Sequence, residues 1–253
     1  MAGDREITNN RENQGMSILR KPLHSKQLRS FTWSLPVLGW LLGLAACGHA
    51  QAQGQINAPP APIASAAAAE SLLVDVLSVD STIAVRLRYL TPDNFTGAPL
   101  PGYEVNRAYL RREAAAALGR VQEQLRAEGL GLLIWDAYRP VSGTEGMVAW
   151  AERTGNMKLF KQGYIARRSR HNMGVAVDLT LVSLDTGRPL EMGTPFDTFS
   201  DAAHTANATG AVARNRQRLV AAMEAQGFKN YDQEWWHFSF EVPNPVPFDV
   251  PVR

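Results

Sequence analysis

Residues 174–182 constrain the fold more tightly than any other stretch of this 253-residue chain, because large and small side chains alternate along them. In a β-strand this alternation places Val and Leu on one face and Gly, Ala, Asp178 and Thr on the other. The aliphatic face is expected to pack into a core. On the other face the small neighbours leave open space beside the Asp178 carboxylate, which indicates that something occupies this space.

The chain from residue 70 to residue 253 is predicted to form a single α+β domain. Apolar residues recur at helical spacing from Leu110 to Leu125, whereas other segments alternate or are uniformly apolar. The expected strands are 83–90, 132–135, 174–182 and 235–241, and the expected helices are 106–127, 143–154 and 212–226. Because these elements follow no regular strand–helix–strand alternation, we expect a central, mostly antiparallel sheet flanked by helices.

Residues 1–46 are predicted to be a signal peptide. Residues 16–30 carry four positive charges and no acid, the apolar run 31–46 follows, and small residues come next. The run has 16 residues, fewer than the roughly 20 that a membrane-spanning helix needs. Met16 is an alternative start, since residues 1–15 add acids that the basic region of a signal peptide does not need.

The single cysteine, Cys47, lies where the leader would be cleaved, and two cleavage sites are possible. Residues 44–47 resemble a bacterial lipobox, in which Cys47 becomes a lipidated first residue. Residues 50–52 form an Ala-x-Ala site that would release a soluble protein. Both alternatives predict an exported protein, either periplasmic or a lipoprotein of the cell envelope. The Ala- and Pro-rich residues 47–69 predict a disordered tether.

The excess of positive charge is confined to the leader. Residues 1–46 hold six of the 26 Lys and Arg and three of the 24 Asp and Glu, which leaves 20 basic and 21 acidic residues downstream. A net charge of −1 gives the folded part no electrostatic case for binding nucleic acid. Membrane contact is expected only through a lipid at Cys47.

Histidine placement indicates a metal site. His171 precedes the strand at 174–182, in a loop that can fold back over Asp178, and His237 lies in the last predicted strand. Two histidines and one carboxylate are the donors of a catalytic zinc site, in which the fourth position stays open for water or substrate. His204 lies among Ala, Thr and Asn and is interpreted as a loop residue.

Glu234 lies three residues before His237, a separation that puts two side chains on opposite faces of a regular strand. We therefore expect the strand to begin after Glu234 or to carry a bulge there. Either arrangement brings the carboxylate to the water, as a general base that is not itself a ligand. Because zinc lowers the pKa of its water to about 7, a carboxylate can take that proton at neutral pH.

Each signal has a structural alternative. A strand histidine is more often a packed, hydrogen-bonded residue than a ligand, and Asp178 and Glu234 taken singly suit an edge or a solvated position. Their combination in one exported chain favours the metal site. Arg139 follows a buried strand and precedes Pro140, so its guanidinium can be aimed into a pocket as a fixed cation. The alternative for Arg139 is a surface ion pair.

Longer motifs resemble a known family. Ser-x-His-x-x-Gly-x-Ala-x-Asp at 169–178 and Glu-x-Trp-His at 234–237 look like the zinc D,D-peptidase superfamily, which includes D-alanyl-D-alanine carboxypeptidases and the fold relative in Hedgehog proteins. More narrowly, the chain resembles the VanX-type D-alanyl-D-alanine dipeptidases. That closer resemblance rests on residues 87–89, 93–97, 136–140, 178–181 and 192–197, and it covers about 75–241.

The resemblance implies the zinc D,D-peptidase fold and one zinc ion per chain, bound by His171, Asp178 and His237. It implies that Glu234 is the general base and then the acid for the leaving amine. It implies that Arg139 polarises the scissile carbonyl and stabilises the oxyanion.

Three further residues are candidates for holding the termini of a dipeptide, namely Ser169, Tyr89 and Asp197. Arg170 departs from the family pattern, which has a small residue beside the ligand His171. An added cation there would favour a longer or more acidic substrate, or point outward.

The resemblance implies zinc-dependent hydrolysis of D-Ala-D-Ala or a related small dipeptide in cell-wall metabolism. The alternatives are a D,D-carboxypeptidase or peptidoglycan endopeptidase acting on wall peptides, and a non-catalytic zinc-binding module of the same fold. Glu234 and Arg139 favour an enzyme, because a binding module needs neither a base nor an oxyanion partner. Loops 91–102 and 184–210 would decide between a closed pocket for a dipeptide and an open cleft for the polymer.

Overall fold

The computed structural model describes residues 64–253, so the predictions for the leader, Met16 and Cys47 lie outside the described residues. Helix α1 (Ala66–Leu72) begins inside the stretch predicted to be a tether. The helix forms there because the Ser65 hydroxyl accepts a hydrogen bond from the backbone N–H of Ala68. Ala69 is buried against the core, so the folded part begins a few residues before residue 70.

The domain is built on a five-stranded sheet in the order β2-β4-β5-β7-β6, with a two-stranded sheet β1-β3 beside it. The strands are β1 (Leu73–Asp75), β2 (Ala84–Val85), β3 (Tyr109–Arg111), β4 (Leu130–Asp136), β5 (Ala176–Ser183), β6 (Phe228–Tyr231) and β7 (Glu234–Phe240). Among the named strands of residues 64–253, β2 and β4 pair in parallel and the other pairs are antiparallel. The expected α+β class and mostly antiparallel sheet are confirmed.

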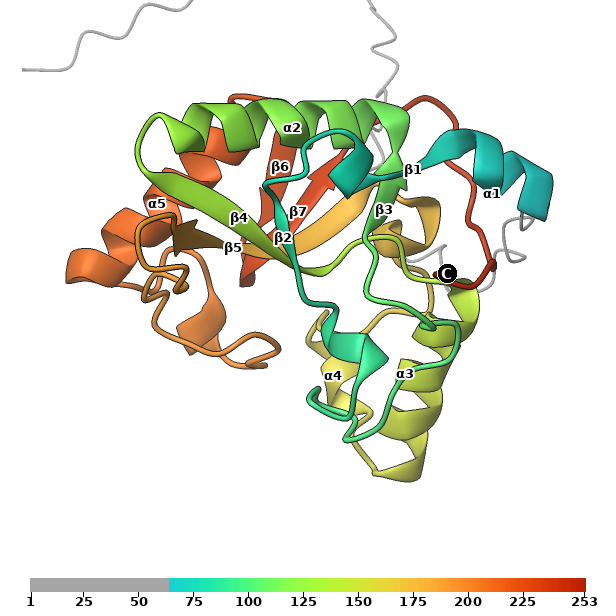
Figure 1. Ribbon diagram of the computed structural model, residues 1–253. Coiled ribbons are helices and arrows are strands. Elements are labelled where there is room, and N and C mark those ends of the chain that lie inside the picture. The colour runs from blue at the N-terminus through green and yellow to red at the C-terminus, as the bar shows by residue number, and fades with distance from the viewer. Residues whose placement is uncertain (1–63) are drawn as a thin grey trace, which may run out of the picture. The chain divides into compact units, whose positions relative to one another are not determined.

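Two long helices, α2 (Arg112–Arg126) and α5 (Gly210–Glu224), lie side by side over one face of the sheet (Figure 1). The helices α3 (Val141–Arg153) and α4 (Lys158–Lys161) lie together away from that face (Figure 1). The long loops between these elements surround the cavity described below.

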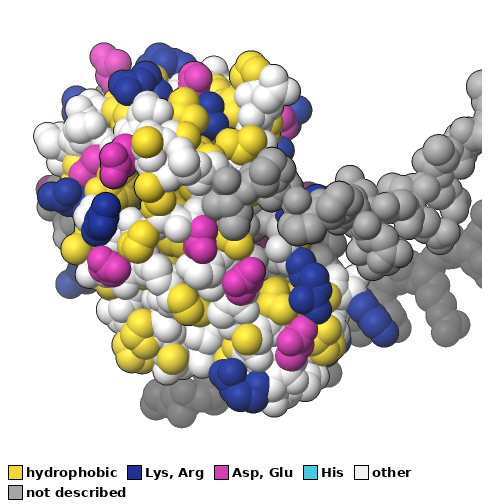
Figure 2. All heavy atoms as spheres, turned by 90° about the vertical axis from the view of Figure 1, so that its right-hand side faces the viewer, with side chains coloured by type: hydrophobic (Ala, Val, Ile, Leu, Met, Phe, Trp, Pro, Cys, Tyr) yellow, Lys and Arg dark blue, Asp and Glu magenta, His cyan; other side chains and the backbone are white. Residues whose placement is uncertain are grey.

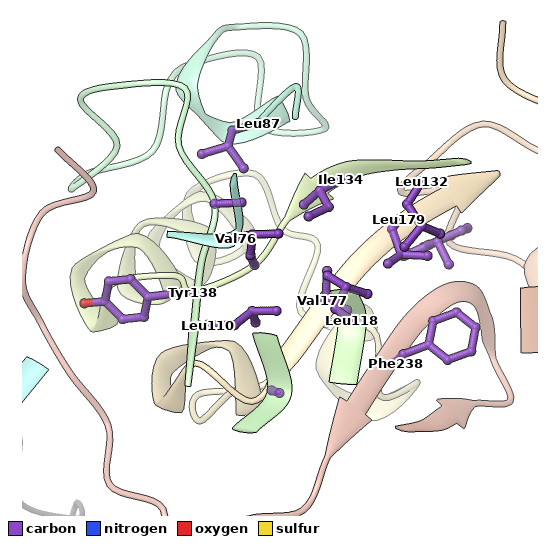
Figure 3. Packing of buried hydrophobic residues seen from close by; sticks show 14 of the residues in the cluster. Val76, Leu87, Leu110, Leu118, Leu132, Ile134, Tyr138, Val177, Leu179 and Phe238 are labelled. Atoms are coloured by element: carbon purple, nitrogen blue, oxygen red, sulfur yellow. The ribbon is translucent and has the colours of Figure 1, made fainter. Parts of the chain in front are cut away.

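The core lies between the sheet and α2. Side chains from α2, β4, β5 and β7 converge there, as Figure 3 shows for Leu118, Ile134, Val177 and Phe238, and all four are fully buried. Burying one such side chain stabilises the fold by about 1.5–3 kcal/mol. This core anchors the central strands that carry Asp178 and His237.

Two predicted elements were too long. The predicted strand 83–90 is a strand only at Ala84–Val85, because residues 88–90 turn into a 3-10 helix that buries Tyr89. The predicted helix 106–127 begins at residue 112, because residues 109–111 pair with β1 as strand β3. Helical spacing of apolar residues could not reveal a strand partner about 36 residues earlier in the chain.

The expected irregularity at Glu234 is present, although the strand does not begin after it. Strand β7 starts at Glu234, and its register with β6 shifts between Asn230 and Tyr231. Asn230 pairs with Phe238 while Tyr231 pairs with Glu234, so the β7 backbone is displaced between these positions. A displacement of this kind re-aims a side chain, and Glu234 lines the same cavity as His237.

The C-terminal tail, residues 242–253, runs across the segments that precede the site. The backbone N–H of Phe248 donates to the Asn172 carbonyl at 2.8 Å. The Tyr138 hydroxyl both donates to the carbonyl and accepts from the N–H of Val250, each at 2.9 Å. The tail therefore ties together the neighbours of His171 and Arg139.

The surface seen in Figure 2 carries basic and acidic side chains interspersed with apolar ones. Within residues 64–253, none of the helices combines the length and the apolar character required to cross a bilayer.

We expect Gly174→Ala to destabilise the fold more than Gly187→Ala. Both glycines have positive φ, +65° and +66°, a conformation that disfavours any side chain. A Cβ at Gly174 would also collide with Leu73, whereas nothing lies within 4 Å of a Cβ at Gly187. Urea unfolding should show a loss of about 1–2 kcal/mol at Gly187 and a clearly larger loss at Gly174. Equal losses would contradict the packing argument.

Candidate active site

Two histidines and one aspartate converge beside the paired strands β5 and β7. The donor atoms of His171, Asp178 and His237 all lie within 4.8 Å of one another. Within residues 64–253, these three residues are the group of His, Cys, Asp or Glu side chains that could hold a metal ion. The His171 Nε2 and His237 Nδ1 atoms are 3.2 Å apart. The Asp178 carboxylate lies 2.9 Å from His237 Nδ1 and 3.4 Å from His171 Nε2. The three residues predicted as ligands are therefore brought together.

The backbone positions each donor. Asp178 and His237 are direct partners in the antiparallel β5–β7 pair, so their side chains stand side by side on one face. His171 lies in a 3-10 turn (η4, Arg170–Met173) that the Ser169 side chain caps by accepting from the His171 N–H. The His171 Nδ1–H donates to the Ala137 carbonyl at 2.7 Å, which leaves the Nε2 lone pair facing the other donors.

This donor set fits a zinc ion. Two nitrogens bound at about 2.0–2.1 Å to one tetrahedral ion lie about 3.3 Å apart, close to the 3.2 Å between His171 Nε2 and His237 Nδ1. Burial lowers the pKa of His237, so the imidazole stays neutral and able to ligate. Although burial opposes ionisation of Asp178, both histidines hold its pKa well below the ordinary carboxyl range. The donors are thus two imidazoles and one carboxylate anion.

Glu234 is a nearly buried carboxyl group beside this donor set. Its Oε2 atom lies 3.9 Å from His237 Nδ1, close enough to reach a molecule bound there without being a donor itself. Burial raises its pKa well above the ordinary value, and the negative charges of Asp178 and Asp197 add to the effect. A carboxylate with a raised pKa is a stronger base at neutral pH, as the predicted role requires.

Arg139 lies on the other flank of the donor set, as part of a buried ion pair. Its Nε and Nη2 atoms donate to Asp136 Oδ2 at 3.0 and 2.7 Å, and its Nη2 is 4.0 Å from Asp178. Tyr103 donates to the other oxygen of Asp136 at 2.6 Å. Despite burial, Asp136 keeps the pKa of Arg139 well above its usual value, so the guanidinium is a permanent cation. The surface ion pair considered for Arg139 is wrong.

We expect Arg139→Met to lower the free energy of unfolding by about 3–5 kcal/mol, because it leaves the fully buried Asp136 carboxylate without its cation. Arg126→Met is the matched control. Arg126 pairs with Asp80 at 2.6 Å, but its side chain is 46% exposed, so the loss should be about 0–1 kcal/mol. Urea unfolding of both variants measures the difference. Similar losses in the free energy of unfolding would mean that Arg139 does not stabilise the buried Asp136 carboxylate.

Asp197, Tyr89 and Ser169 line the same cavity. The Tyr89 hydroxyl lies 3.1 Å from both oxygens of Asp197 and donates to that carboxylate. Burial and the charge of Asp178 raise the pKa of Asp197 well above the ordinary range. The three predicted substrate-binding residues therefore face one space, with an acidic group at Asp197 and a hydroxyl at Ser169.

The cavity has a volume of about 310 Å³. Aromatic side chains form much of its wall: Phe95 packs edge-on against Phe199, and Phe199 packs against Tyr164. The ion-binding donors, Glu234 and Arg139 all face this space. It is a small, partly apolar pocket with convergent polar groups, the usual form of a small-molecule site.

Arg170 lines the cavity but is tied to the end of β7. Its Nη2 atom donates to the Phe240 carbonyl at 2.7 Å and lies 3.2 Å from the Glu241 carboxylate. The guanidinium of Arg170 thus follows the second of the two expected alternatives, in which it points outward. His204 is a loop residue as expected, with its Nε2 3.3 Å from the Tyr164 hydroxyl, and it is not part of the donor group.

The sequence predicts no role for Asp136, although this residue is the first of the family-like segment 136–140. Asp136 holds Arg139, and its Oδ2 atom also lies 3.3 Å from His171 Nδ1. Tyr103, its other partner, lies in a loop and gave no local signal. A buried acid three residues before an arginine is the sequence feature that could have indicated the pair.

A buried histidine–aspartate–histidine donor set with an adjacent carboxyl group and a fixed arginine is the arrangement expected of a catalytic metal site. A family model described as D-ala-D-ala dipeptidase matches residues 69–246. The chain belongs to this family of zinc metallopeptidases and is a hydrolase.

Named relatives have the same description. A D-alanyl-D-alanine dipeptidase of Enterococcus faecium is 40% identical over 185 residues, which cover 66% of this chain and 91% of the relative. One from Streptomyces coelicolor is 38% identical, covering 65% and 90%, and one from Escherichia coli is 32% identical, covering 70% and 88%.

Solved structures show weaker similarity. The D,D-dipeptidase VanXYg in complex with a D-Ala-D-Ala phosphinate analogue has a TM-score of 0.34 at 18% identity, covering 67% of this chain and 66% of that one. VanYB in complex with D-alanine-D-alanine has a TM-score of 0.36 at 14% identity, covering 55% and 75%.

Proposed function

We propose that the protein hydrolyses D-Ala-D-Ala or a closely related dipeptide in cell-wall metabolism, with one zinc ion per chain. The observation that carries the proposal is the meeting of a three-donor set with Glu234 and Arg139 in one cavity. The family and its named D-alanyl-D-alanine dipeptidases support the substrate.

His171, Asp178 and His237 would hold the zinc ion, since their donor atoms already face one another. When bound, zinc supplies a positive charge that polarises a carbonyl and acidifies water. The second-sphere contact from His171 Nδ1–H to the Ala137 carbonyl keeps the imidazole in one orientation. A ligand held in this way needs no rearrangement on binding.

Glu234 acts as the proton carrier. Its carboxylate takes a proton from the attacking water, whose oxygen forms a bond to the scissile carbonyl carbon. The carboxylic acid then gives that proton to the peptide nitrogen as the C–N bond breaks, so the products are two amino acids. The raised pKa suits both transfers, because the group can hold the proton between the two steps.

Arg139 stabilises the negative charge that develops on the carbonyl oxygen. Its guanidinium is fixed by Asp136 and cannot lose its proton, so it provides a pre-organised cation at the cavity wall. Removing one such donor typically slows catalysis by about 10²–10³-fold. The Arg139–Asp136 pair thus serves both stability and the reaction.

The ends of the dipeptide meet groups of different character. We assign the substrate ammonium to Asp197, whose carboxylate is buried beside the Tyr89 hydroxyl, and the carboxylate end to the Ser169 side of the cavity. An ammonium would restore a full negative charge on Asp197 by pairing with it. This arrangement requires a free amino terminus on the substrate.

The cavity size favours a dipeptide over a wall polymer. At about 310 Å³ it lies at the lower end of the usual range for ligand pockets, roughly 300–1,000 Å³. A D,D-carboxypeptidase or an endopeptidase must accommodate a stem peptide that continues on the amino side, where Asp197 lies.

One assay tests the proposal. The purified protein, with and without added zinc, is offered D-Ala-D-Ala, L-Ala-D-Ala and a wall pentapeptide ending in D-Ala-D-Ala, and released D-alanine is measured. We expect zinc-dependent release from D-Ala-D-Ala and little from the pentapeptide. Preferential release from the pentapeptide would favour the carboxypeptidase instead.

We also propose that the protein is exported, as a periplasmic protein or as a lipoprotein anchored at Cys47. The support is the order of the basic, apolar and small residues in the leader. Cell fractionation with a Cys47→Ser variant tests it: lipidation predicts that the wild type fractionates with membranes and the variant does not. Recovery of both in the cytoplasm would contradict export.

A further inference from the structure

Arg216 of α5 is a buried cation whose hydrogen bonds within residues 64–253 go to backbone carbonyls. The residue is 1% exposed, and within residues 64–253 no carboxylate forms an ion pair with it. Its Nε donates to the Met192 carbonyl at 2.8 Å, its Nη1 to that of His204 at 2.7 Å and its Nη2 to that of Ala202 at 3.0 Å. All three acceptors belong to one loop.

That loop, residues 192–204, is called here the Asp197 loop, and it forms part of the cavity wall through Asp197 and Phe199. It has a second attachment at Thr194, whose hydroxyl accepts from the indole N–H of Trp235 at 2.8 Å. The Arg216 guanidinium lies 5.8 Å from the centre of the Trp235 ring. Arg216 and Trp235 thus fix the loop, and neither of them lines the cavity.

Asp197 itself needs such support. Its φ is +59°, in the left-handed region that a residue with a side chain rarely adopts. Strained backbone of this kind persists only where the surroundings determine it fully. The three hydrogen bonds that the Arg216 guanidinium donates hold the loop backbone in place, because hydrogen bonds from a cation are stronger than those from a neutral donor.

We propose that Arg216 is a positioning residue for substrate binding, which holds the Asp197 loop so that the Asp197 carboxylate meets the ammonium of the dipeptide. This inference rests on the proposed function. Arg216 does not touch the substrate and acts through Asp197. The metal donors lie on η4, β5 and β7, and none of them belongs to the loop.

Lysine cannot replace arginine in this position. The guanidinium presents its donors in a planar fork toward three carbonyls, whereas an ammonium offers one nitrogen on a flexible stem. Arg216→Lys therefore keeps the charge and removes at least one attachment. Arg218→Lys is the matched control, because Arg218 lies on the same helix, is half exposed and pairs with Glu128 at 3.2 Å.

The experiment is a double-mutant cycle on the full chain, with Arg216→Lys, Asp197→Asn and the double variant. D-Ala-D-Ala is the substrate, and kcat, KM, bound zinc and Tm are measured for each. We expect Arg216→Lys to lower kcat/KM by roughly 10- to 100-fold, the usual effect of misplacing a binding group by about 1 Å. The loss should appear mainly in KM, with zinc content unchanged and Arg218→Lys within about twofold of the wild type.

If Arg216 acts through Asp197, the double variant is no worse than Asp197→Asn alone. Effects that multiply in the double variant would show a general structural role and overturn the inference, as would an Asp197→Asn variant with wild-type kcat/KM. Loss of zinc from Arg216→Lys would also overturn it. A wild-type protein without activity on D-Ala-D-Ala would instead refute the proposed function on which the inference depends.

Discussion

Glu234→Gln is expected to lower kcat for D-Ala-D-Ala by about 10²–10⁴-fold, the usual contribution of a general acid–base group. Glutamine has nearly the same shape but cannot accept and return a proton. Because Glu234 is not one of the three converging donors, the variant should keep one zinc ion per chain. Steady-state kinetics and metal analysis of the same preparation measure both quantities.

Asp232→Asn is the control for this substitution, since Asp232 is an exposed acid two residues earlier in the turn before β7. Its kinetics should match those of the wild type. Zinc loss from Glu234→Gln would show that Glu234 is a ligand, and retention of more than about a tenth of the wild-type kcat would show that another group moves the proton.

Removal of zinc with a chelator is expected to abolish activity, and addition of zinc should restore it. Lewis-acid stabilisation is worth several kcal/mol, which corresponds to a loss of about 10³-fold or more in rate. Zinc should also stabilise the fold, by about 4 kcal/mol at a free concentration 1,000 times its Kd. Activity and Tm of the stripped and the reconstituted protein provide the measurement.

Histidine variants test whether the zinc ion is bound by the three predicted donors. His171→Ala should lose bound zinc and activity together, because it removes the donor that faces both Asp178 and His237. His204→Ala should retain both, since His204 contacts Tyr164 and lies outside the donor group. Stoichiometric zinc in the His171→Ala protein would contradict the proposed ligands.

Each donor could be predicted from the sequence because it lies in a short local pattern, although the β5–β7 pairing that brings Asp178 and His237 together joins residues 59 positions apart. The period of two in 174–182 places Asp178 on the face with small side chains, and the His171 turn and the strand of His237 are short motifs with one conformation each. The class of fold followed from the mixture of element types. These features depend on residues a few positions apart, where periodicity is informative.

Other elements depend on partners distant in the chain. Strand β3 forms because it pairs with β1, and Asp136 matters because Tyr103 and Arg139 meet it. Whereas the three-residue spacing of Asp136 and Arg139 is a local pattern, the β1–β3 pairing and the contact of Tyr103 with Asp136 leave none. The same applies to Arg216, which looks like any helical arginine until the loop that it binds is seen.

The C-terminal tail makes the site sensitive to changes at a distance from it. Phe248 and Val250 bind the residues beside His171 and Arg139, although no residue of the tail lines the cavity. A substitution that detaches the tail would therefore loosen the segments that carry these two side chains without removing any group that faces the cavity.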